Sequence, residues 1–249
     1  MVSAIKHSAG TQTLLRGLAV INAVEAGCKD LKSISEFTAT PRSTTHRLLS
    51  ALVELRYMRY APGAGYSLGA KLIELGAKAL DSISLPALAR PWLHELAQAT
   101  KDTVHLGIRD GDEVLYLEKI NSQRGLEMRS RPGHRMPLAL TGIGKALLLN
   151  DDQETLQTLF LRQGDEQFLD RFLASMYRYA KSGYAFDLEE NEPTIRCVAA
   201  PVFDASNRLI AAISVASTAT YMSRDRMDQL IPLVQSCARQ ISAEVGWAE

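Results

Sequence analysis

The first 70 residues alternate helix-forming and turn-forming segments in an order that strongly limits how they can fold. Apolar side chains recur at helical spacing over residues 11–27, again over 30–39, and again over 42–55. The third segment follows a proline, which is well tolerated in a first helical turn. Two short strand-like segments, 57–60 and 65–68, then flank a turn centred on Pro62-Gly63. Three helices followed by a hairpin predict a winged helix-turn-helix.

Individual residues predict where these helices begin and end. Thr11 and Asp30 precede the first and second apolar runs and are expected to cap their helices, while Gly27 is expected to end the first. Thr40 precedes a proline, and a residue in that position disfavours the helical conformation. The second and third helices are therefore expected to be separate.

The third helix is the one that a helix-turn-helix inserts into the major groove of DNA, with its amino-terminal residues leading. Arginine forms paired hydrogen bonds with guanine edges, and hydroxyl side chains reach phosphates or bases. Gly63 and Gly65 are expected to let the backbone of the hairpin approach the DNA closely. The expected DNA-binding residues are Arg42, Ser43, Thr44, Thr45, His46 and Arg47 on the helix, with Arg56 and Arg59 at the hairpin.

The charges of the chain are unevenly distributed, although its formal net charge is zero. Residues 1–70 hold eight Lys or Arg against four Asp or Glu, a net charge of +4. The remaining residues hold twenty basic and twenty-four acidic side chains, a net charge of −4. A basic amino-terminal part joined to an acidic larger part favours contact of the first part with a polyanion.

From residue 71 onward the pattern changes. Residues 71–82 predict a connecting helix, and another helix is expected to begin at Pro91. Strand-like runs at 103–111, 113–120 and 125–133 precede a helix at 141–149 and two helical segments at 154–161 and 166–183. Strands at 184–187, 195–204 and 209–218 come before a last helix at 223–245. This order predicts an antiparallel sheet covered by helices, so the chain as a whole is of the α+β class.

Composition excludes several other classes of protein. The chain has 249 residues, of which 46% are apolar and 22% charged, as in soluble globular proteins. There is no run of 18 apolar residues and no apolar secretory segment at the start, so no membrane association is expected. Cys28, Cys197 and Cys237 are widely spaced and odd in number, which fits a reducing cytoplasm and predicts neither disulfides nor a CxxC metal site.

Catalytic signatures are also missing from the sequence. The five histidines show no metal-ligand spacing, and neither a GxSxG nor a GxxxxGK[ST] motif occurs. We therefore expect no enzyme activity, no catalytic residue, no metal and no cofactor.

Several separated motifs carry a resemblance to a known family. They are, in chain order, LLRGLAVI, PRSTTHRLLSAL, YSLGAKLIELG, PGHRMPLALTGIGKALL, GYAFDLEEN, IRCVAAPVFD and LIAAISVA. From about residue 10 to 247 the chain resembles the IclR family of bacterial transcriptional regulators. The resemblance implies a winged helix-turn-helix domain (8–70), a linker helix (71–86) and an effector-binding domain related to GAF and PAS folds (87–249). It also implies homodimers or homotetramers that control catabolic operons in response to small organic acids, aromatic acids or sugar-derived compounds.

The resemblance further implies an effector site, formed by Met136, Gly142, Ile143, Asp187, Ile195, Cys197 and Ser214. The chemistry of these residues suits a small acid, because Gly142 and Ile143 open a helix whose free N–H groups favour a carboxylate. Asp187 offers an acceptor for hydroxyl groups. Cys197 has an alternative role as a small buried apolar residue. The chain departs from the family pattern at Ala216, where some members have a second serine, and at Arg56, where a glycine often precedes the wing.

Together these features predict a cytoplasmic DNA-binding regulator, more often a repressor than an activator, that binds a palindromic operator. Its expected effector is a small carboxylate or a sugar acid. Two alternatives stay open at this point. One is a ligand-sensing signalling protein whose helix-turn-helix contacts other proteins and has no specific operator. The other is an enzyme acting on the same small acid.

Overall fold

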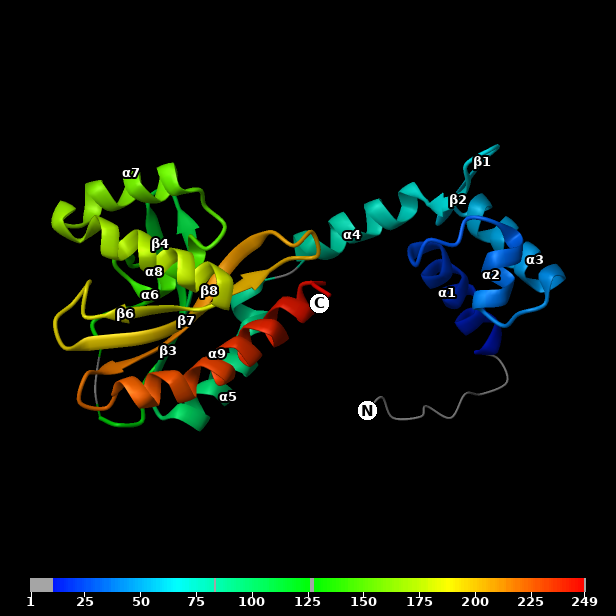
Figure 1. Ribbon diagram of the computed structural model, residues 1–249. Helices are drawn as coiled ribbons and strands as arrows, with labels where there is room; N and C mark the ends of the chain where they lie inside the picture. The colour runs from blue at the N-terminus through cyan, green and yellow to red at the C-terminus, as the bar shows by residue number, and fades with distance from the viewer. Residues whose placement is uncertain (1–10, 83, 126–127, 249) are drawn as a thin grey trace. The chain divides into compact units, whose positions relative to one another are not determined.

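The computed structural model describes residues 11–82, 84–125 and 128–248 (Figure 1). Residue contacts divide the chain into two compact units, Met1–Ser82 and Ile83–Glu249. The division falls inside the segment 71–86 in which the linker helix is expected. Each unit has its own apolar core.

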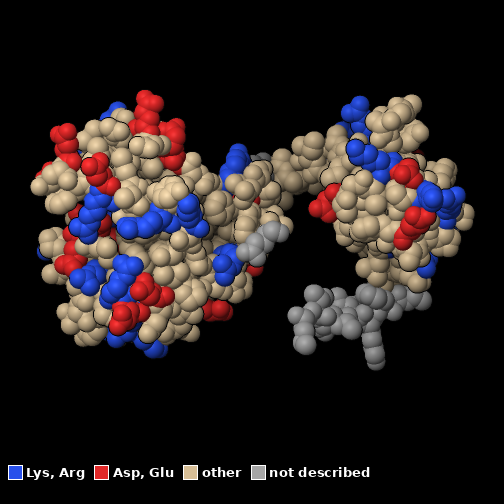
Figure 2. All heavy atoms as spheres, viewed as in Figure 1, with Lys and Arg blue, Asp and Glu red and all other residues tan. Residues whose placement is uncertain are grey.

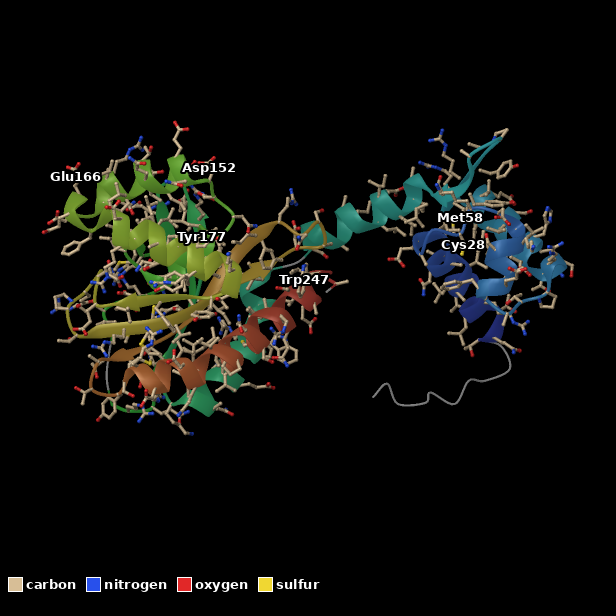
Figure 3. All side chains as sticks on the ribbon, viewed as in Figure 1. Cys28, Met58, Asp152, Glu166, Tyr177 and Trp247 are labelled. Atoms are coloured by element: carbon tan, nitrogen blue, oxygen red, sulfur yellow. The ribbon has the colours of Figure 1, made fainter. Side chains whose placement is uncertain are left out.

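The N-terminal unit is a winged helix-turn-helix, as predicted. Its elements are α1 (Gln12–Glu25), α2 (Leu31–Phe37), α3 (Arg42–Glu54), the strands β1 (Met58–Ala61) and β2 (Gly65–Leu68), and α4 (Ala70–Ser82). The two strands pair in an antiparallel hairpin, the wing. The core of the unit is formed by one face of α1 together with Ile34, Leu49 and Met58, all nearly fully buried. Met58 and the half-buried Cys28 lie among the helices in Figure 3.

Two of the three predicted helix-end signals are confirmed. Asp30 caps α2, because its Oδ1 accepts hydrogen bonds from the backbone N–H groups of Lys32 and Ser33, each at 2.9 Å. Gly27 follows α1 with a φ of +97°, the left-handed conformation that commonly ends a helix. The prediction for Thr11 is wrong, because its side chain makes no capping hydrogen bond and its backbone is already helical.

The wing packs against the loop between α1 and α2 through Gly65. The residue has a φ of +80°, and a β-carbon placed on it would stand 2.1 Å from the carbonyl oxygen of Lys29. The N–H of Tyr66 donates to that same oxygen at 2.8 Å. Gly65 is therefore needed for packing inside the unit, whereas Gly63 lies at the tip of the wing with open space around its Cα.

The C-terminal unit is built on a six-stranded antiparallel sheet with the strand order β5-β4-β3-β8-β7-β6. The strands are β3 (Thr103–Asp110), β4 (Glu113–Ile120), β5 (Arg135–Pro137), β6 (Ala185–Leu188), β7 (Ile195–Phe203) and β8 (Leu209–Thr218). The helices are α5 (Leu85–Thr100), α6 (Gly142–Leu147), α7 (Gln153–Gln163), α8 (Leu169–Ser182) and α9 (Arg224–Glu244), with a short 3-10 turn η1 (Glu166–Phe168) before α8. Helices α5 and α9 cover one face of the sheet, and α6, with α7 and α8 beyond it, covers the other (Figure 1). The α+β prediction is confirmed.

One predicted strand is wrong. Of the run 125–133, residues 126–127 lie outside the described ranges, and the other residues form no strand. The Nζ of Lys119 donates to the carbonyl oxygens of Met128 at 2.6 Å and Ser130 at 2.8 Å, so a side chain replaces part of the strand ladder. Gly133, with a φ of +87°, then turns the chain into the short strand β5.

Helix α5 begins six residues earlier than predicted, at Leu85 instead of Pro91. Pro86 occupies the first turn, where its missing N–H costs no intrahelical hydrogen bond. Pro91 lies inside the helix on its exposed side, where water can hydrate the carbonyl that loses its partner.

Candidate functional site

The amino-terminal half of α3 presents most of the residues expected to contact DNA. Arg42, Ser43, His46 and Arg47 are exposed, and Thr44 is half-buried. Within the described part of the chain, neither Arg42 nor Arg47 forms an ion pair with a carboxylate, so both cations remain available to a polyanion.

Two further arginines lie at the wing, one before it and one on its first strand, and both are exposed. Arg56 follows α3 with a φ of +65°, a conformation that favours glycine. Arg59 lies on β1. In Figure 2, Lys and Arg side chains gather at the wing end of the unit, while basic and acidic side chains are mixed over its other elements.

The prediction that Thr45 contacts DNA is wrong. Its side chain is fully buried, and its Oγ1 lies 3.3 Å from the carbonyl oxygens of both Thr40 and Pro41. The Oγ of Ser35 donates to the same Thr40 carbonyl at 2.5 Å. Thr45 lies on the inward face of α3 together with Leu49, four residues later. Its hydroxyl therefore hydrogen-bonds the turn between α2 and α3 and does not face DNA.

The expected effector residues converge on one cavity of the C-terminal unit, about 290 Å³ in volume, between the sheet and α6. Six of the seven line its wall: Met136, Ile143, Asp187, Ile195, Cys197 and Ser214. The seventh, Gly142, lies directly behind them, because a β-carbon on it would stand 2.4 Å from the Sγ of Cys197.

Strand register explains why these residues meet. Asp187 on β6 pairs with Cys197 on β7, which pairs with Ala216 on β8. Two residues before Ala216 on β8, Ser214 lies opposite His105 on β3. Paired residues on neighbouring antiparallel strands share a face, so these side chains form one continuous wall of the cavity.

Asp187 is the buried acid of this wall, with 4% of its surface exposed. Burial raises the pKa of Asp187 to about 7, and the nearby Lys145 offsets only part of that rise. The Oδ1 of Asp187 accepts a hydrogen bond of 2.9 Å from the N–H of Glu190. This carboxyl group therefore gains or loses a proton near neutral pH.

Lys145 is a buried cation whose Nζ lies 2.8 Å from Oε1 of Glu190 and donates to the carbonyl of Phe186 at 3.1 Å. Burial opposes ionisation of Glu190, but the ion pair with Lys145 outweighs it and lowers the pKa of Glu190. Glu190 thus holds the charge that balances Lys145, and Asp187 is left as the acid that titrates.

Cys197 and the start of α6 form a neutral part of the wall. Burial, followed by the neighbouring Asp187, raises the pKa of the Cys197 thiol to about 12, so the group stays protonated at neutral pH. The N–H of Gly142 faces this sulfur, and the N–H of Gly144 donates to Oγ1 of Thr141 at 3.1 Å. These two N–H groups of the first turn of α6, which the sequence predicts to be free, therefore already have partners inside the protein.

Sequence reasoning missed the part of the cavity formed by β3, β4 and the loop before β5. It includes His105, Tyr116, Ser130 and His134. The Nε2 of His105 lies 2.7 Å from Oγ of Ser130, and its ring stacks on Tyr116 with a centroid distance of 4.8 Å. Burial lowers the pKa of His105 to about 3, so the ring is neutral. A histidine within the apolar run of β3 was the available signal.

The described ranges contain no group of three His, Cys, Asp or Glu side chains arranged to hold a metal ion. Within the same ranges, no helix has the length and apolar character needed to cross a bilayer.

Comparison with known protein families matches both units. Residues 77–243 match the family described as bacterial transcriptional regulator IclR C-terminal, and residues 13–62 match the IclR helix-turn-helix domain.

Among curated proteins, the chain is similar to three regulators of Escherichia coli (strain K12). It is 33% identical to KdgR over 225 residues, covering 87% of this chain and 86% of that protein. It is 33% identical to XynR over 246 residues, covering 95% and 98%. It is 32% identical to the DNA-binding transcriptional repressor YiaJ over 256 aligned positions, covering 97% and 90%.

Solved structures show the same architecture. The Agobacterium tumefaciens repressor BlcR matches with a TM-score of 0.81 at 20% identity, covering 97% of this chain and all of that one. The C-terminal domain of E. coli KdgR matches with a TM-score of 0.57 at 31% identity, covering 66% of this chain and all of that one. With both family domains present in order and relatives similar along most of their length, the chain belongs to the IclR family of bacterial transcriptional regulators.

Proposed function

We propose that this regulator represses a catabolic operon and that a small organic acid or sugar acid, bound in the cavity of the C-terminal unit, changes its affinity for DNA. The observation that carries the proposal is the pairing of two features in one chain: exposed, unpaired arginines at the start of α3, and a cavity lined by apolar walls and a few buried polar groups.

The DNA contacts that we assign are those of α3 and the wing, with Thr45 left out. Arg42 and Arg47 lie at the leading end of the recognition helix, where each can contact a backbone phosphate on any sequence and a guanine edge on the operator. A homodimer or homotetramer would present such helices in pairs. Paired helices reach successive major grooves about 34 Å apart, so the operator is expected to be palindromic.

The size and chemistry of the cavity support a small effector. Its volume of about 290 Å³ is at the lower end of the range for small-molecule sites. Met136 and Ile195 supply apolar wall, while Asp187 and Ser214 supply hydrogen-bonding groups. We assign the cavity a binding role. Burial raises the pKa of its one thiol, Cys197, so that group is no nucleophile at neutral pH.

Control of DNA binding then follows from linkage. A ligand that binds one arrangement of the effector domains more tightly shifts the population toward it, and with it the spacing of the recognition helices. Repression as the outcome is supported by the similarity to YiaJ, a DNA-binding transcriptional repressor. We place the protein in the cytoplasm, where a regulator of this family meets both DNA and metabolites.

Salt dependence of binding to a mixed-sequence duplex tests the DNA-binding step. Binding through phosphates loses about 0.9 log unit of affinity per log unit of salt for each contact. We expect a steep slope that becomes shallower by about one contact in Arg42→Ala, with Arg239→Ala, an exposed arginine of α9, as the matched control. A signalling protein whose helix-turn-helix contacts proteins would bind the duplex weakly, and Arg42→Ala would change nothing.

A further inference from the structure

A groove of about 490 Å³ lies beside α8 in the C-terminal unit, and we call it the α8 groove. Four basic side chains line it: Arg171, Arg178 and Lys181 of α8, and Arg224 at the start of α9. All four are exposed, and Figure 2 shows basic side chains along α8 on the face turned to the viewer. The residues after position 70 carry a net charge of −4, so this concentration of positive charge is local.

The sequence of α8 places cations and hydroxyl groups on one face of the helix. Arg171, Ser175, Arg178 and Ser182 follow one another at intervals of four, three and four residues, and all four line the groove. Such intervals bring side chains to the same side of a helix. Arginine only donates hydrogen bonds, and a serine hydroxyl donates as well. This wall therefore presents donors to a molecule in the groove.

Contacts with neighbouring side chains show where two of the guanidinium groups lie. That of Arg224 lies over the ring of Phe186, 4.6 Å from its centroid, and Phe186 also lines the groove. That of Arg178 donates to the Oγ of Ser175 at 3.1 Å. Burial raises the pKa of the Tyr179 phenol to about 12, and both Arg224 and Arg178 oppose that rise. Two cations from different helices therefore converge on the same part of the groove.

Carboxylates of the protein do not balance these charges. Among the described residues, Glu190 is the one acid that lines the groove, and its Oε1 lies 2.8 Å from the Nζ of the buried Lys145. Asp228 lies 3.4 Å from Arg224, longer than the roughly 2.8 Å of a strong charged hydrogen bond. In the described part of the chain, the three basic residues of α8 form no ion pair. Like charges gathered in one hollow repel one another, and a bound anion relieves that repulsion.

The α8 groove is separate from the effector cavity. Phe186 and Leu188 of β6 line the groove, whereas Asp187, between them, lines the cavity. Alternate residues of a strand point to opposite faces, so β6 separates the two spaces. A site in the groove therefore goes beyond the proposed function and does not depend on the effector acid.

We propose that the α8 groove is a second ligand site, which binds a phosphorylated small metabolite such as a sugar phosphate through the four basic residues that line it. A phosphate monoester carries close to two negative charges at neutral pH and presents three acceptor oxygens. Guanidinium groups bind phosphate through pairs of parallel hydrogen bonds, and the groove offers three such groups. The groove, at about 490 Å³ against about 290 Å³ for the effector cavity, also has room for the organic part of the molecule beside the rings of Tyr184 and Phe186.

Calorimetric titration of the full-length protein at constant ionic strength tests the site, with D-glucose 6-phosphate and inorganic pyrophosphate as probes and D-glucose as the uncharged control. We expect at least one of the two phosphate compounds to bind once per chain, and glucose not to bind. Arg171→Gln and Arg178→Gln should each weaken that binding about tenfold or more, because each removes a charge-assisted hydrogen bond to phosphate. Arg239→Gln removes the same charge from an exposed position of α9 outside the groove and should leave binding unchanged.

The proposal is overturned if neither phosphate compound binds, or if Arg239→Gln weakens binding as much as the two groove variants do. Binding that stays at the wild-type level in both groove variants would place the compounds elsewhere and overturn it as well. A shallower salt slope of DNA binding in Arg178→Gln would assign the groove to DNA, and a smaller assembly in sedimentation would assign it to a second copy of the chain. Either result would overturn the proposal. Thermal unfolding checks that the variants, which change exposed side chains, keep the fold.

Discussion

A β-carbon on Gly142 would stand 2.4 Å from the Sγ of Cys197. The same atom would lie 2.9 Å from the backbone nitrogen of Asp187, so the first turn of α6 touches both β6 and β7. Real β-carbons do not approach other atoms this closely. The shape of the cavity therefore depends on the absence of a side chain at Gly142, which lies against Cys197 and Asp187 of the cavity wall.

Gly142→Ala should push α6 away from the sheet. We expect a loss of about 1–3 kcal/mol in the free energy of unfolding, the usual cost of overpacking a core, together with weaker effector binding. Denaturant unfolding and ligand titration measure the two effects. Gly76→Ala in α4 is the control, since a β-carbon there meets nothing within 4 Å and alanine favours the helix. Equal stability of the two variants would contradict the packing described for α6.

Asp187→Asn should change how stability depends on pH. The folded pKa of Asp187, about 7, is above its ordinary value of 3.8, so the folded state binds the proton more tightly than the unfolded chain. The contribution of this group is fully present below about pH 4 and is lost as the pH rises through about 7. When the pH rises from 5 to 8, the free energy of unfolding of the asparagine variant should therefore increase, relative to that of the wild type, by on the order of 2 kcal/mol.

Unfolding by denaturant at the two pH values measures this difference. Glu189→Gln serves as a control, because hydrogen bonds from Arg196 and from the N–H of Thr194 outweigh the effect of burial and lower the pKa of that carboxyl. An unchanged difference between wild type and Asp187→Asn over this pH range would mean that Asp187 keeps its charge throughout.

Substitutions at Thr45 and Arg47 should affect different properties, the first only the stability of the protein and the second only its binding to DNA. Thr45→Ala removes a buried hydroxyl that bonds the turn between α2 and α3, so it should cost about 1 kcal/mol of stability without altering the salt slope of DNA binding. Arg47→Ala removes an exposed cation, so it should lower the salt slope by about one contact and leave the unfolding curve in place. Thermal unfolding and a salt series of binding titrations check both variants. If Thr45→Ala changed the slope while keeping full stability, its inward placement would be refuted.

Gly65 and Gly63 both have a positive φ, but only one of them is crowded. Gly65→Ala places a β-carbon against the Lys29 carbonyl and should cost more than about 2 kcal/mol, because backbone strain and a clash combine. Gly63→Ala meets open space and should cost about 1 kcal/mol through strain alone. Denaturant unfolding compares them, and a smaller effect at position 65 than at 63 would contradict the packing of the wing on the loop before α2.

The elements that sequence predicts well are those whose signals are local. Asp30 and Gly27 act within a few residues of themselves, and the continuous apolar runs of β7 and β8 reflect burial on both faces of the sheet. Thr45 could not be placed in the same way, since it stands beside Thr44 and a hydroxyl residue gives no apolar signal for the inward face. The failed strand at 125–133 depends on Lys119, whose side chain reaches across from β4 to carbonyls that a strand would have used.

The cavity, too, depends on contacts between residues far apart in the sequence, which the sequence alone does not predict. Its wall residues on α6, β6, β7 and β8 came from family resemblance and not from spacing, and the structure brings them together. His105, Tyr116 and Ser130 come from strands and a loop that meet them only through sheet order. A lone histidine in an apolar strand does not reveal, from sequence, that its ring stacks on Tyr116 in the wall of a cavity.

Capture of sheared DNA from the source genome on the purified protein, followed by sequencing of the bound fragments, tests the central claim most directly. The account predicts enrichment of a few sites that share a palindrome, with half-sites one helical turn or a multiple of it apart, and loss of that enrichment in Arg42→Ala. Salt-sensitive binding with no preferred site, unchanged by the substitution, would contradict it and favour a ligand sensor without an operator.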